Sequence, residues 1–248
     1  MLAKNLSNRA LSLEDRVLVF SYDFHHPKTM SFLEVLFRCK IPIGAIVAAP
    51  WVKLKDGSSA IQMAEKKSDA KELAIDHDVP WITLAHDDVA GIAKTRDRFG
   101  CSWGLVAGAR IISQEVIDLF PKGILNVHPG PLPQSAGLGA LFRIVNESLP
   151  LEVTAHFIDH RVDAGWKVAT SKICLDQTAS KWSDFELASL QAQNACLLSI
   201  CRQIGDKTTF KCDEICRGPL KPPISEKQKR YIRDILFSEL LKKTALRR

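Results

Sequence analysis

The spacing of apolar segments is the feature that most restricts the fold of this 248-residue chain. Short apolar runs of strand length alternate with longer stretches whose apolar residues recur at helical spacing. The runs cover residues 16–22, 43–49, 80–84, 103–109 and 124–128. Such alternation predicts an α/β fold with a mostly parallel sheet and helices on both faces.

The rest of the chain extends this plan. Two further strands are expected at residues 152–159 and 167–175, and a long amphipathic helix is expected at 181–204. The length is sufficient for one large domain with its own hydrophobic core. We therefore expect one domain over residues 16–205, followed over 206–248 by a connector and a C-terminal basic amphipathic helix.

The C-terminal part has its own local signals. Residues 205–224 are rich in Gly, Pro, Cys and Lys, which indicates a connector. Ser225-Glu-Lys-Gln228 has the capping-box pattern, which predicts a helix that runs to about Lys243. The apolar face expected for this helix consists of Ile232, Ile235, Leu236 and Leu240.

The net charge of +6 belongs to this C-terminal part. Residues 221–248 contain nine basic and three acidic residues, so the remaining chain is balanced overall. A solvated amphipathic helix accounts for this pattern, because no basic stripe with interleaved aromatic residues accompanies it. We expect no nucleic-acid partner, and an RNA-binding tail is the alternative.

Composition also bears on the compartment and on metals. No apolar run approaches the roughly 18 to 20 residues of a membrane span, and the N-terminus lacks a signal-peptide pattern. We expect a cytoplasmic protein with no membrane partner. The seven cysteines are odd in number and scattered, which suits reduced thiols. Cys212 and Cys216 have zinc-like spacing without a second ligand pair beside them, so no metal is expected.

Polar side chains mark the end of one expected strand. Asn126 and His128 lie two residues apart before Pro129, which cannot continue a strand's hydrogen bonds. Residues two apart on a strand point to the same side, so both side chains face one crevice. In open α/β sheets, the crevice at the carboxyl ends of the strands is the usual ligand site. The turn sequence Asp163-Ala-Gly165 follows 35 residues after His128.

An amide, an imidazole and a carboxylate suffice for acyl transfer to an amine. Asn126 offers N–H groups to a tetrahedral oxyanion, and His128 can stabilise that oxyanion and handle the proton. Asp163 can orient the imidazole and favour its charged form. Each residue alone is more often structural, because Asn and Asp form turns and a His-Pro pair often just ends a strand. Their combination favours a catalytic site.

Four sequence blocks carry a family resemblance. They are Asn126-Val-His128-Pro-Gly-Pro-Leu-Pro133, Gly137-Leu-Gly-Ala-Leu-Phe-Arg-Ile-Val-Asn146, Val153-Thr-Ala-His156-Phe-Ile-Asp159 and Val162-Asp163-Ala-Gly165. Together they resemble the folate-dependent formyltransferases over roughly residues 16–205. The resemblance implies a Rossmann-like catalytic domain that uses 10-formyltetrahydrofolate as formyl donor. It also implies that Asn126, His128 and Asp163 match the catalytic triad and that His156 matches a recurrent histidine.

The same resemblance implies where the folate lies. The segment from Leu105 to Ile112 looks like the loop whose backbone receives the pterin, and Gly108 would let a flat ring approach the main chain. The loop before Asp163 would line the other side. The expected cofactor-binding residues are Val106, Ala107, Gly108, Ala109, Arg110, Ile111, Ile158, Asp159, His160 and Val162.

Members of this family differ in their acceptors. Glycinamide ribonucleotide enzymes have a glycine-rich phosphate loop after the first strand, whereas residues 22–27 here contain no glycine. Methionyl-tRNA formyltransferases and formyltetrahydrofolate hydrolases carry an additional domain for which we expect no room here. The resemblance is then closest to the sugar N-formyltransferases, which implies an amino sugar acceptor and a role in lipopolysaccharide or surface-glycan biosynthesis.

The acceptor itself is less defined. It would be a nucleotide-linked amino sugar or a free acidic one, and its expected contacts are Phe24, His25, Gly137 and Leu138. Ala136 and Trp166 stand where the family often has arginine and proline, so the acceptor side departs from the family pattern at these two positions. The alternatives are a non-catalytic folate-binding module and a formyltransferase for a non-sugar amine. A homodimer is compatible with the apolar face of the tail helix.

Overall fold

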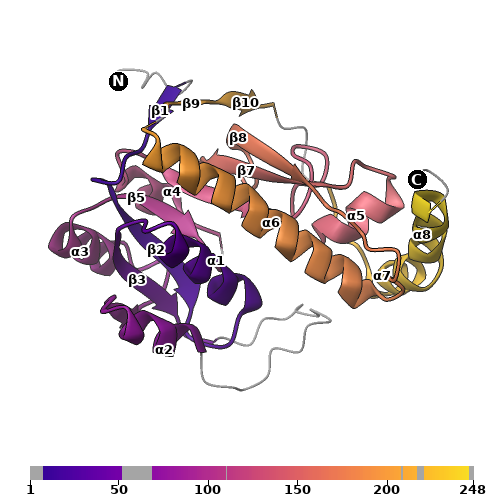
Figure 1. The fold of residues 1–248 in the computed structure, drawn as a ribbon, viewed down its shortest axis with the longest axis horizontal. Helices are drawn as coiled ribbons and strands as arrows, with labels where there is room; N and C mark the ends of the chain where they lie inside the picture. Colours follow the sequence, from indigo (N-terminus) through magenta and orange to yellow (C-terminus); the bar gives the residue numbers. More distant parts are fainter. Residues whose placement is uncertain (1–7, 52–68, 110, 208, 217–220, 246–248) are drawn as a thin grey trace.

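The computed structural model describes residues 8–51, 69–109, 111–207, 209–216 and 221–245. Its main feature is an eight-stranded sheet flanked by helices (Figure 1). From one edge to the other, its strands are β10 (Asp213–Ile215), β8 (Gly165–Lys172), β7 (Glu152–Ile158), β6 (Ile124–His128), β5 (Cys101–Val106), β2 (Arg16–Tyr22), β3 (Ile43–Ala49) and β4 (Trp81–Thr83). Strands β2 to β6 are parallel, and β7, β8 and β10 continue the sheet in antiparallel fashion. The predicted α/β fold is confirmed.

Helices connect the parallel strands. They are α1 (Pro27–Arg38), α2 (Asp69–Asp76), α3 (Val89–Phe99) and α4 (Gln114–Asp118). Helix α5 (Ala140–Asn146) lies between β6 and the antiparallel β7, and α6 (Trp182–Gly205) follows β8. Helix α1 begins at Pro27, because His26 caps its N-terminus and Pro27 has a φ suited to the first turn. Helix α6 runs diagonally across the molecule beside α1 (Figure 1).

Two large hydrophobic clusters form most of the core, one on each face of the sheet. Val17 and Val19 of β2 belong to the cluster under α1 and α6, whereas Leu18 and Phe20 belong to the cluster on the opposite face. This division follows from the alternation of side chains along a strand. Strand β6 obeys the same rule, since Val127 belongs to the α1 and α6 cluster.

The expected connector at 205–224 contains two strands, which corrects the prediction. Strand β9 (Thr209–Lys211) pairs with β1 (Asn8–Ala10), and β10 pairs with β8 at the edge of the main sheet. Strands β9 and β10 each have one buried apolar side chain, Phe210 in β9 and Ile215 in β10. A single apolar residue per strand gives no periodic signal, so only tertiary pairing reveals these strands.

The C-terminal helix begins as predicted, with Ser225 as its cap. It then consists of α7 (Glu226–Tyr231), a π-helical segment η1 (Ile232–Leu236) and α8 (Phe237–Ala245). The wider π turn places Ile232 and Phe237, five residues apart, on the same buried side. Ile235, expected on the apolar face, is 48% exposed for this reason.

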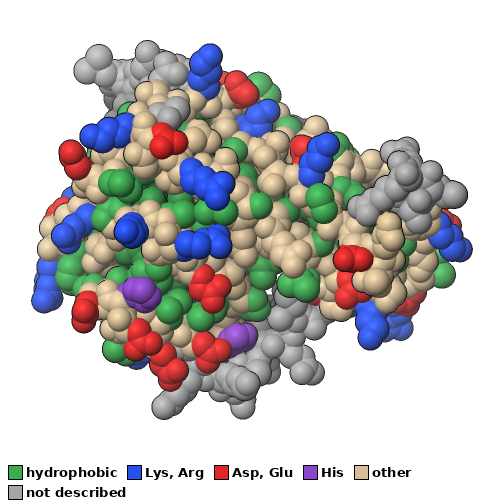
Figure 2. Space-filling view, viewed as in Figure 1, with side chains coloured by type: hydrophobic (Ala, Val, Ile, Leu, Met, Phe, Trp, Pro, Cys, Tyr) green, Lys and Arg blue, Asp and Glu red, His purple; other side chains and the backbone are tan. Residues whose placement is uncertain are grey.

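The visible surface carries charges of both signs (Figure 2). On the face shown in Figure 2, basic side chains are spread over the surface together with acidic ones. Among the described residues, we find no helix with the length and hydropathy needed to cross a membrane.

Candidate active site

The structure brings together the histidine and the aspartate that the sequence singles out. His128 ends β6, and Asp163 lies in the loop between β7 and β8. The Nδ1 atom of His128 is 3.4 Å from Oδ1 of Asp163, and the two side chains are 6% and 17% exposed. The other carboxylate oxygen accepts a hydrogen bond from the backbone N–H of Gly137 at 2.7 Å. The imidazole and the carboxylate therefore form a pair that is largely shielded from water.

Both ring nitrogens of His128 face oxygen atoms. Nε2 lies 3.2 Å from the carbonyl oxygen of Ser135, while Nδ1 faces Asp163. A neutral imidazole donates from one nitrogen only, whereas an imidazolium donates from both. The surroundings thus provide a hydrogen-bond acceptor for each N–H of a protonated ring, and Asp163 balances its charge.

Asp163 is held as a carboxylate in an unusual backbone conformation. Burial by itself would raise its pKa, but the hydrogen bond and charge of His128 and the Gly137 N–H hold that pKa well below the ordinary range. Its φ of 52° lies in the left-handed region, which aspartate tolerates better than most residues. A Cβ on Gly165 would lie 2.1 Å from the carbonyl oxygen of Phe157, so this turn requires glycine.

Asn126 is oriented by a buried histidine on the neighbouring strand. His156 of β7 is fully buried, and its pKa falls to about 4 because burial and the nearby His128 disfavour its charged form. The neutral ring has one N–H, and its Nδ1 lies 2.9 Å from the carbonyl oxygen of Ala164. Its Nε2 then accepts from the Asn126 amide at 3.3 Å. Among the described residues the second N–H of Asn126 has no hydrogen-bond acceptor, so it can donate to a ligand.

The loop after β5 is anchored to the first strand. Strand β5 ends at Val106 rather than at Ala109, because the N–H groups of Ala107 and Gly108 both donate to the carbonyl oxygen of Phe20 at 3.0 Å. Val106 pairs in register with Asn126, which places the end of this strand beside the candidate site. Ala107 is fully buried, so its side chain faces the core rather than a ligand.

Gly108 has close neighbours from its own chain. A Cβ at this position would lie 2.9 Å from Nδ1 of His26 and 3.0 Å from Cδ2 of Tyr22. The glycine therefore permits the packing of two rings of the protein, which is a different reason from the one expected. Ala109 is half-buried and Ile111 is 76% exposed, while Arg110 lies outside the described residues.

The loop between β7 and β8 has a polar anchor. Asp159 accepts hydrogen bonds from the backbone N–H of Arg161 at 2.8 Å and from its Nε at 3.0 Å. Arg161 also approaches Glu214 of β10 at 3.7 Å. Asp159 is thus engaged within the protein. The other expected folate contacts in this loop are the half-buried Ile158 and Val162 and the exposed His160.

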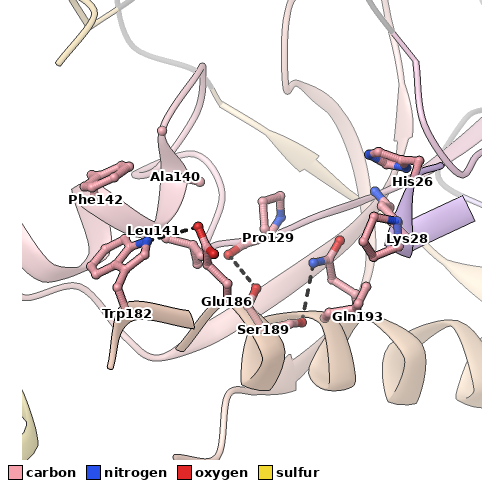
Figure 3. A pocket seen from close by; sticks show the side chains of 13 residues that line it. His26, Lys28, Pro129, Ala140, Leu141, Phe142, Trp182, Glu186, Ser189 and Gln193 are labelled. Atoms are coloured by element: carbon pink, nitrogen blue, oxygen red, sulfur yellow. Dashed lines mark hydrogen bonds between the residues drawn. The ribbon is translucent and has the colours of Figure 1, made fainter. Parts of the chain in front are cut away.

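A cavity of about 360 Å³ lies on the α1 and α6 side of Pro129 (Figure 3). We call it the α6 trough. Its lining consists of His26, Pro27, Lys28, Pro129, Gly139, Ala140, Leu141, Phe142, Trp182, Glu186, Ser189, Leu190 and Gln193. The last five residues recur at helical spacing along one face of α6. Polar residues on an otherwise apolar helix face are the sequence signal for this cavity, and they are Glu186, Ser189 and Gln193. They are not among the site residues predicted from the sequence.

One wall of the α6 trough is aromatic. The rings of Phe142 and Trp182 stack with centroids 4.5 Å apart and planes inclined by 17°. Nε1 of Trp182 donates to Glu186 at 3.1 Å. The wall is therefore apolar and fixed by a hydrogen bond, which suits contact with an apolar part of a ligand.

Two polar groups in the α6 trough lack partners. Oε2 of Glu186 and Oε1 of Gln193 are buried and accept no hydrogen bond from the described residues. Burial raises the pKa of the Glu186 carboxyl. Gln193 is 6% exposed, and its Nε2 donates to the backbone oxygen of Ser189 at 3.4 Å. Buried acceptors without partners are unfavourable, so the α6 trough is suited to a ligand with hydrogen-bond donors.

The expected acceptor contacts lie partly elsewhere. Phe24 stacks on Tyr22, and Nδ1 of His25 lies 3.5 Å from Asp69, so both are directed to their own neighbours. Neither lines the α6 trough, which is lined instead by His26 of the same loop and by Lys28 of α1. Gly137 contacts Asp163, and Leu138 is 80% exposed between two glycines with positive φ.

Comparison with known proteins gives the family. The model of the family described as formyl transferase matches residues 49–194. This chain belongs to that family. The match includes the strand end at Asn126 and His128, the turn at Asp163 and the first part of α6.

Curated relatives match over shorter segments. Phosphoribosylglycinamide formyltransferase of Arabidopsis thaliana chloroplasts is 34% identical over 84 residues, which are 31% of this chain and 28% of that protein. Methionyl-tRNA formyltransferase of Solibacter usitatus is 44% identical over 62 residues, which are 25% of this chain and 20% of that protein. The chain thus spans less than a third of the length of these relatives.

Solved structures show the same fold over most of the chain. Phosphoribosylglycinamide formyltransferase from Anaplasma phagocytophilum is 19% identical with a TM-score of 0.60, covering 82% of this chain and 96% of its own. A Mycobacterium tuberculosis protein proposed as a sugar N-formyltransferase is 17% identical with a TM-score of 0.56, covering 84% and 75%. The α/β fold is therefore the Rossmann-like fold of formyltransferases.

Proposed function

We propose that this chain transfers a formyl group from 10-formyltetrahydrofolate to a primary amine of an amino sugar. The observation that carries the proposal is the placement of Asn126, His128 and Asp163. Asn126 and His128 point to the sheet face opposite Val127, and the α6 trough lies on the Val127 face beside Pro129. The loops at 106–111 and 158–162 would hold the folate that donates the formyl group. The amino sugar that accepts it would lie in the α6 trough. The two molecules would then approach this trio of residues from opposite sides of the sheet.

The trio supplies the groups that the reaction needs. 10-Formyltetrahydrofolate, when bound, supplies the formyl carbon that the amine nitrogen attacks. Asn126 would donate its free N–H to the developing oxyanion, a device whose loss costs about 10²- to 10³-fold in rate. His128 would donate its Nε2–H to the same oxygen in place of the Ser135 carbonyl oxygen and move the amine proton toward the leaving nitrogen of the folate. Asp163 would keep the imidazole oriented and balance its charge.

The residues present fit this donor. A formyl transfer requires hydrogen-bond donors and a proton carrier at one point, and the donors are Asn126 and the ring of His128. Apolar side chains for a flat pterin and its attached ring are the half-buried Ile158 and Val162 and the exposed Ile111. Arg110, also expected to contact the folate, lies outside the described residues.

The α6 trough supports a sugar as the acceptor. The apolar wall of Phe142 and Trp182 can pack against the C–H groups of a sugar ring. The unpartnered oxygens of Glu186 and Gln193 would accept hydrogen bonds from hydroxyl groups. A ligand with a ring and several hydroxyl groups meets both requirements.

Glycinamide ribonucleotide is the second candidate acceptor. Several of the solved structures similar to this chain are named phosphoribosylglycinamide formyltransferases, which motivates this candidate. The loop at residues 23–26 contains no glycine, so a phosphate nest of backbone N–H groups is not expected there. We therefore place the amino sugar first.

One assay separates the candidates. Tetrahydrofolate formation is measured with 10-formyltetrahydrofolate and nucleotide-linked amino sugars, free acidic amino sugars or glycinamide ribonucleotide. Turnover with a sugar that disappears in His128→Ala supports the proposal. Turnover with glycinamide ribonucleotide and with none of the sugars would show that glycinamide ribonucleotide is the acceptor. Folate binding without turnover on any amine points to the binding module.

A further inference from the structure

One loop supplies hydrogen-bond partners to both His128 and Asp163. We call residues 129–139, between β6 and α5, the site loop. Its Ser135 carbonyl oxygen lies 3.2 Å from Nε2 of His128, and its Gly137 N–H donates to Asp163 at 2.7 Å. Gly137 has a φ of 94°, a conformation that favours glycine. The orientation of the imidazole and of the carboxylate therefore depends on where this loop lies.

The site loop is held by neighbouring segments rather than by regular secondary structure. It consists of turns and bends, and such segments move more easily than strands or helices. The N–H of Leu132 donates to Oγ1 of Thr154 of β7 at 3.1 Å. Leu132 and Ala136 also form a small apolar cluster with the buried Ile215 of β10. A residue from the C-terminal part of the chain thus helps to hold the loop.

Residues 221–224, which we call the clamp segment, also contact the site loop. Nζ of Lys221 donates to the carbonyl oxygen of Gln134 at 2.8 Å. The next carbonyl along the chain is the one that faces the imidazole. At the other end of the loop, a Cβ on Gly139 would lie 3.8 Å from Cδ1 of Ile224. The clamp segment therefore contacts the loop before and after the two groups that it directs to the candidate active site.

The clamp segment is itself anchored to α5, the helix that follows the site loop. Nη2 of Arg143 donates to the carbonyl oxygen of Pro222 at 2.8 Å, and Arg143 is 5% exposed. Glu147, one turn later, forms an ion pair with Lys221 and lies 3.9 Å from Nη1 of Arg143. Hydrogen bonds from a charged donor are stronger than neutral ones, so these contacts fix the segment. Figure 1 shows α5 beside the C-terminal helices, which agrees with this arrangement.

The family match does not cover the clamp segment. It ends at residue 194, whereas β10 and the clamp segment follow α6. The matched part contains His128, Asp163 and the site loop. The residues that would carry the reaction are therefore held in part by a later region of the chain.

We propose that Arg143 and Lys221 are positioning residues for the formyl transfer. Arg143 fixes the clamp segment, and Lys221 fixes the site loop, which in turn orients His128 and Asp163. Each acts through the backbone of the loop rather than by touching a substrate. The inference rests on the proposed function, because it assumes the catalytic roles of His128 and Asp163.

Lys221 is the residue at which the inference is tested first, because its side chain is 38% exposed and its replacement should leave the fold intact. Lys221→Met removes the ammonium and keeps an unbranched side chain, whereas Lys221→Arg keeps a charged donor. The matched control is Lys227→Met, which changes an exposed lysine on α7. Arg143→Met and Arg143→Lys form a second pair at the buried position. Glu147→Gln removes the ion-pair partner of Lys221 and replaces Lys221→Met in the test if that variant does not fold.

The backbone amide of Gly137 gives a readout that needs no substrate. Its N–H donates to a carboxylate, and such a hydrogen bond moves the amide proton NMR signal downfield and slows its exchange with solvent. We expect Lys221→Met and Arg143→Met to move this signal upfield and to speed the exchange. Lys221→Arg and Arg143→Lys should have smaller effects, and Lys227→Met should have none. An unchanged Gly137 signal in Lys221→Met overturns the inference.

Kinetics then tests whether the displacement matters for the reaction. With 10-formyltetrahydrofolate and an amine that the wild type formylates, we expect kcat to fall about tenfold in Lys221→Met, because a displacement of about 1 Å can cost up to about 10²-fold. Both KM values should stay unchanged. Lys221→Arg should recover most of the rate, and Lys227→Met should match the wild type.

The two readouts distinguish failure of this inference from failure of the proposed function. An unchanged kcat in Lys221→Met overturns the inference even where the Gly137 signal moves, and so does a rate loss that Lys221→Arg does not recover. A wild type that formylates no amine contradicts the proposed function instead. In that case the Gly137 signal alone decides whether Lys221 holds the site loop.

Discussion

The amide of Asn126 donates to Nε2 of His156 at 3.3 Å, so a fully buried histidine fixes the direction of the candidate oxyanion donor. His156 is itself fixed, because its Nδ1–H donates to Ala164. Ala164 follows Asp163, and the chain of contacts therefore joins all three residues of the trio. The fold determines the orientation of Asn126 through a residue that need not touch the substrate.

Replacing His156 is therefore expected to reduce the rate by disordering Asn126. In His156→Phe the ring shape is retained, but the hydrogen bonds to Asn126 and Ala164 are lost. We expect kcat to fall by less than the roughly 10²- to 10³-fold expected for Asn126→Ala, with little change in folate affinity. Steady-state kinetics and folate binding measure these effects.

The double variant is the control for this interpretation. If His156 acts through Asn126, then Asn126→Ala combined with His156→Phe has the same kcat as Asn126→Ala alone. Independent, multiplicative losses would show that His156 contributes by another route.

His26 is expected to make stability depend on pH. Its pKa falls to about 4 because burial and the neighbouring Lys28 disfavour the charged ring, whereas an unfolded histidine titrates near 6.5. Between these values the unfolded chain binds more protons, so the free energy of unfolding decreases as the pH falls from about 6.5 to 4. The full difference for this one residue is about 3 kcal/mol.

The variant His26→Asn separates the titration from the helix cap. His26 caps α1 by accepting from the N–H of Thr29 at 3.4 Å, and asparagine is also a good capping residue. Urea unfolding at several pH values should give a shallower decrease in His26→Asn than in the wild type. Equal slopes would rule out His26 as the source.

The sequence predicts the sheet and the trio because both depend on local patterns. Apolar runs mark β2, β3 and β6, and the positions of Asn126 and His128 on a strand place them on one side. Asp163 has the backbone of a turn, which its Asp-Ala-Gly sequence indicates. These features follow from a few consecutive residues.

The α6 trough could not be predicted in the same way, because it is formed by residues far apart in the chain. Lys28, Phe142 and Gln193 belong to three helices, and only their packing creates the cavity. The segment after β2 shows this limit, because the sequence predicts His25 as an acceptor contact, whereas His26 and Lys28 line the cavity. The π turn at Ile232 likewise depends on packing, because its sequence resembles that of an ordinary helix.

Gly108 is expected to be intolerant of a larger residue. A Cβ would lie 2.9 Å from His26 and 3.0 Å from Tyr22, and both contacts are with rings that have little room to move. Gly108→Ala should lower the free energy of unfolding by about 1–3 kcal/mol, as overpacking typically does. Chemical denaturation measures the change.

Gly205 provides the matched control. It ends α6, and a Cβ there would meet no atom within 4 Å. Gly205→Ala should be neutral or stabilising by up to about 1 kcal/mol, since alanine is the better helix former. A similar loss in both variants would show that the contacts of Gly108 are not the cause.

Phe237 is expected to connect the C-terminal helix to the acceptor side. Its ring packs edge-on against Trp182 at 5.4 Å and stacks on Phe185 at 5.5 Å, and it is 2% exposed. Phe237→Ala should lower the free energy of unfolding by about 3–5 kcal/mol. Because Trp182 forms the wall of the α6 trough, KM for the acceptor should rise while KM for the folate stays unchanged.

The control is Ser238→Ala, which changes an exposed neighbour of Phe237 and should affect neither KM value. A parallel rise in both KM values would mean that Phe237 supports the whole domain rather than the trough.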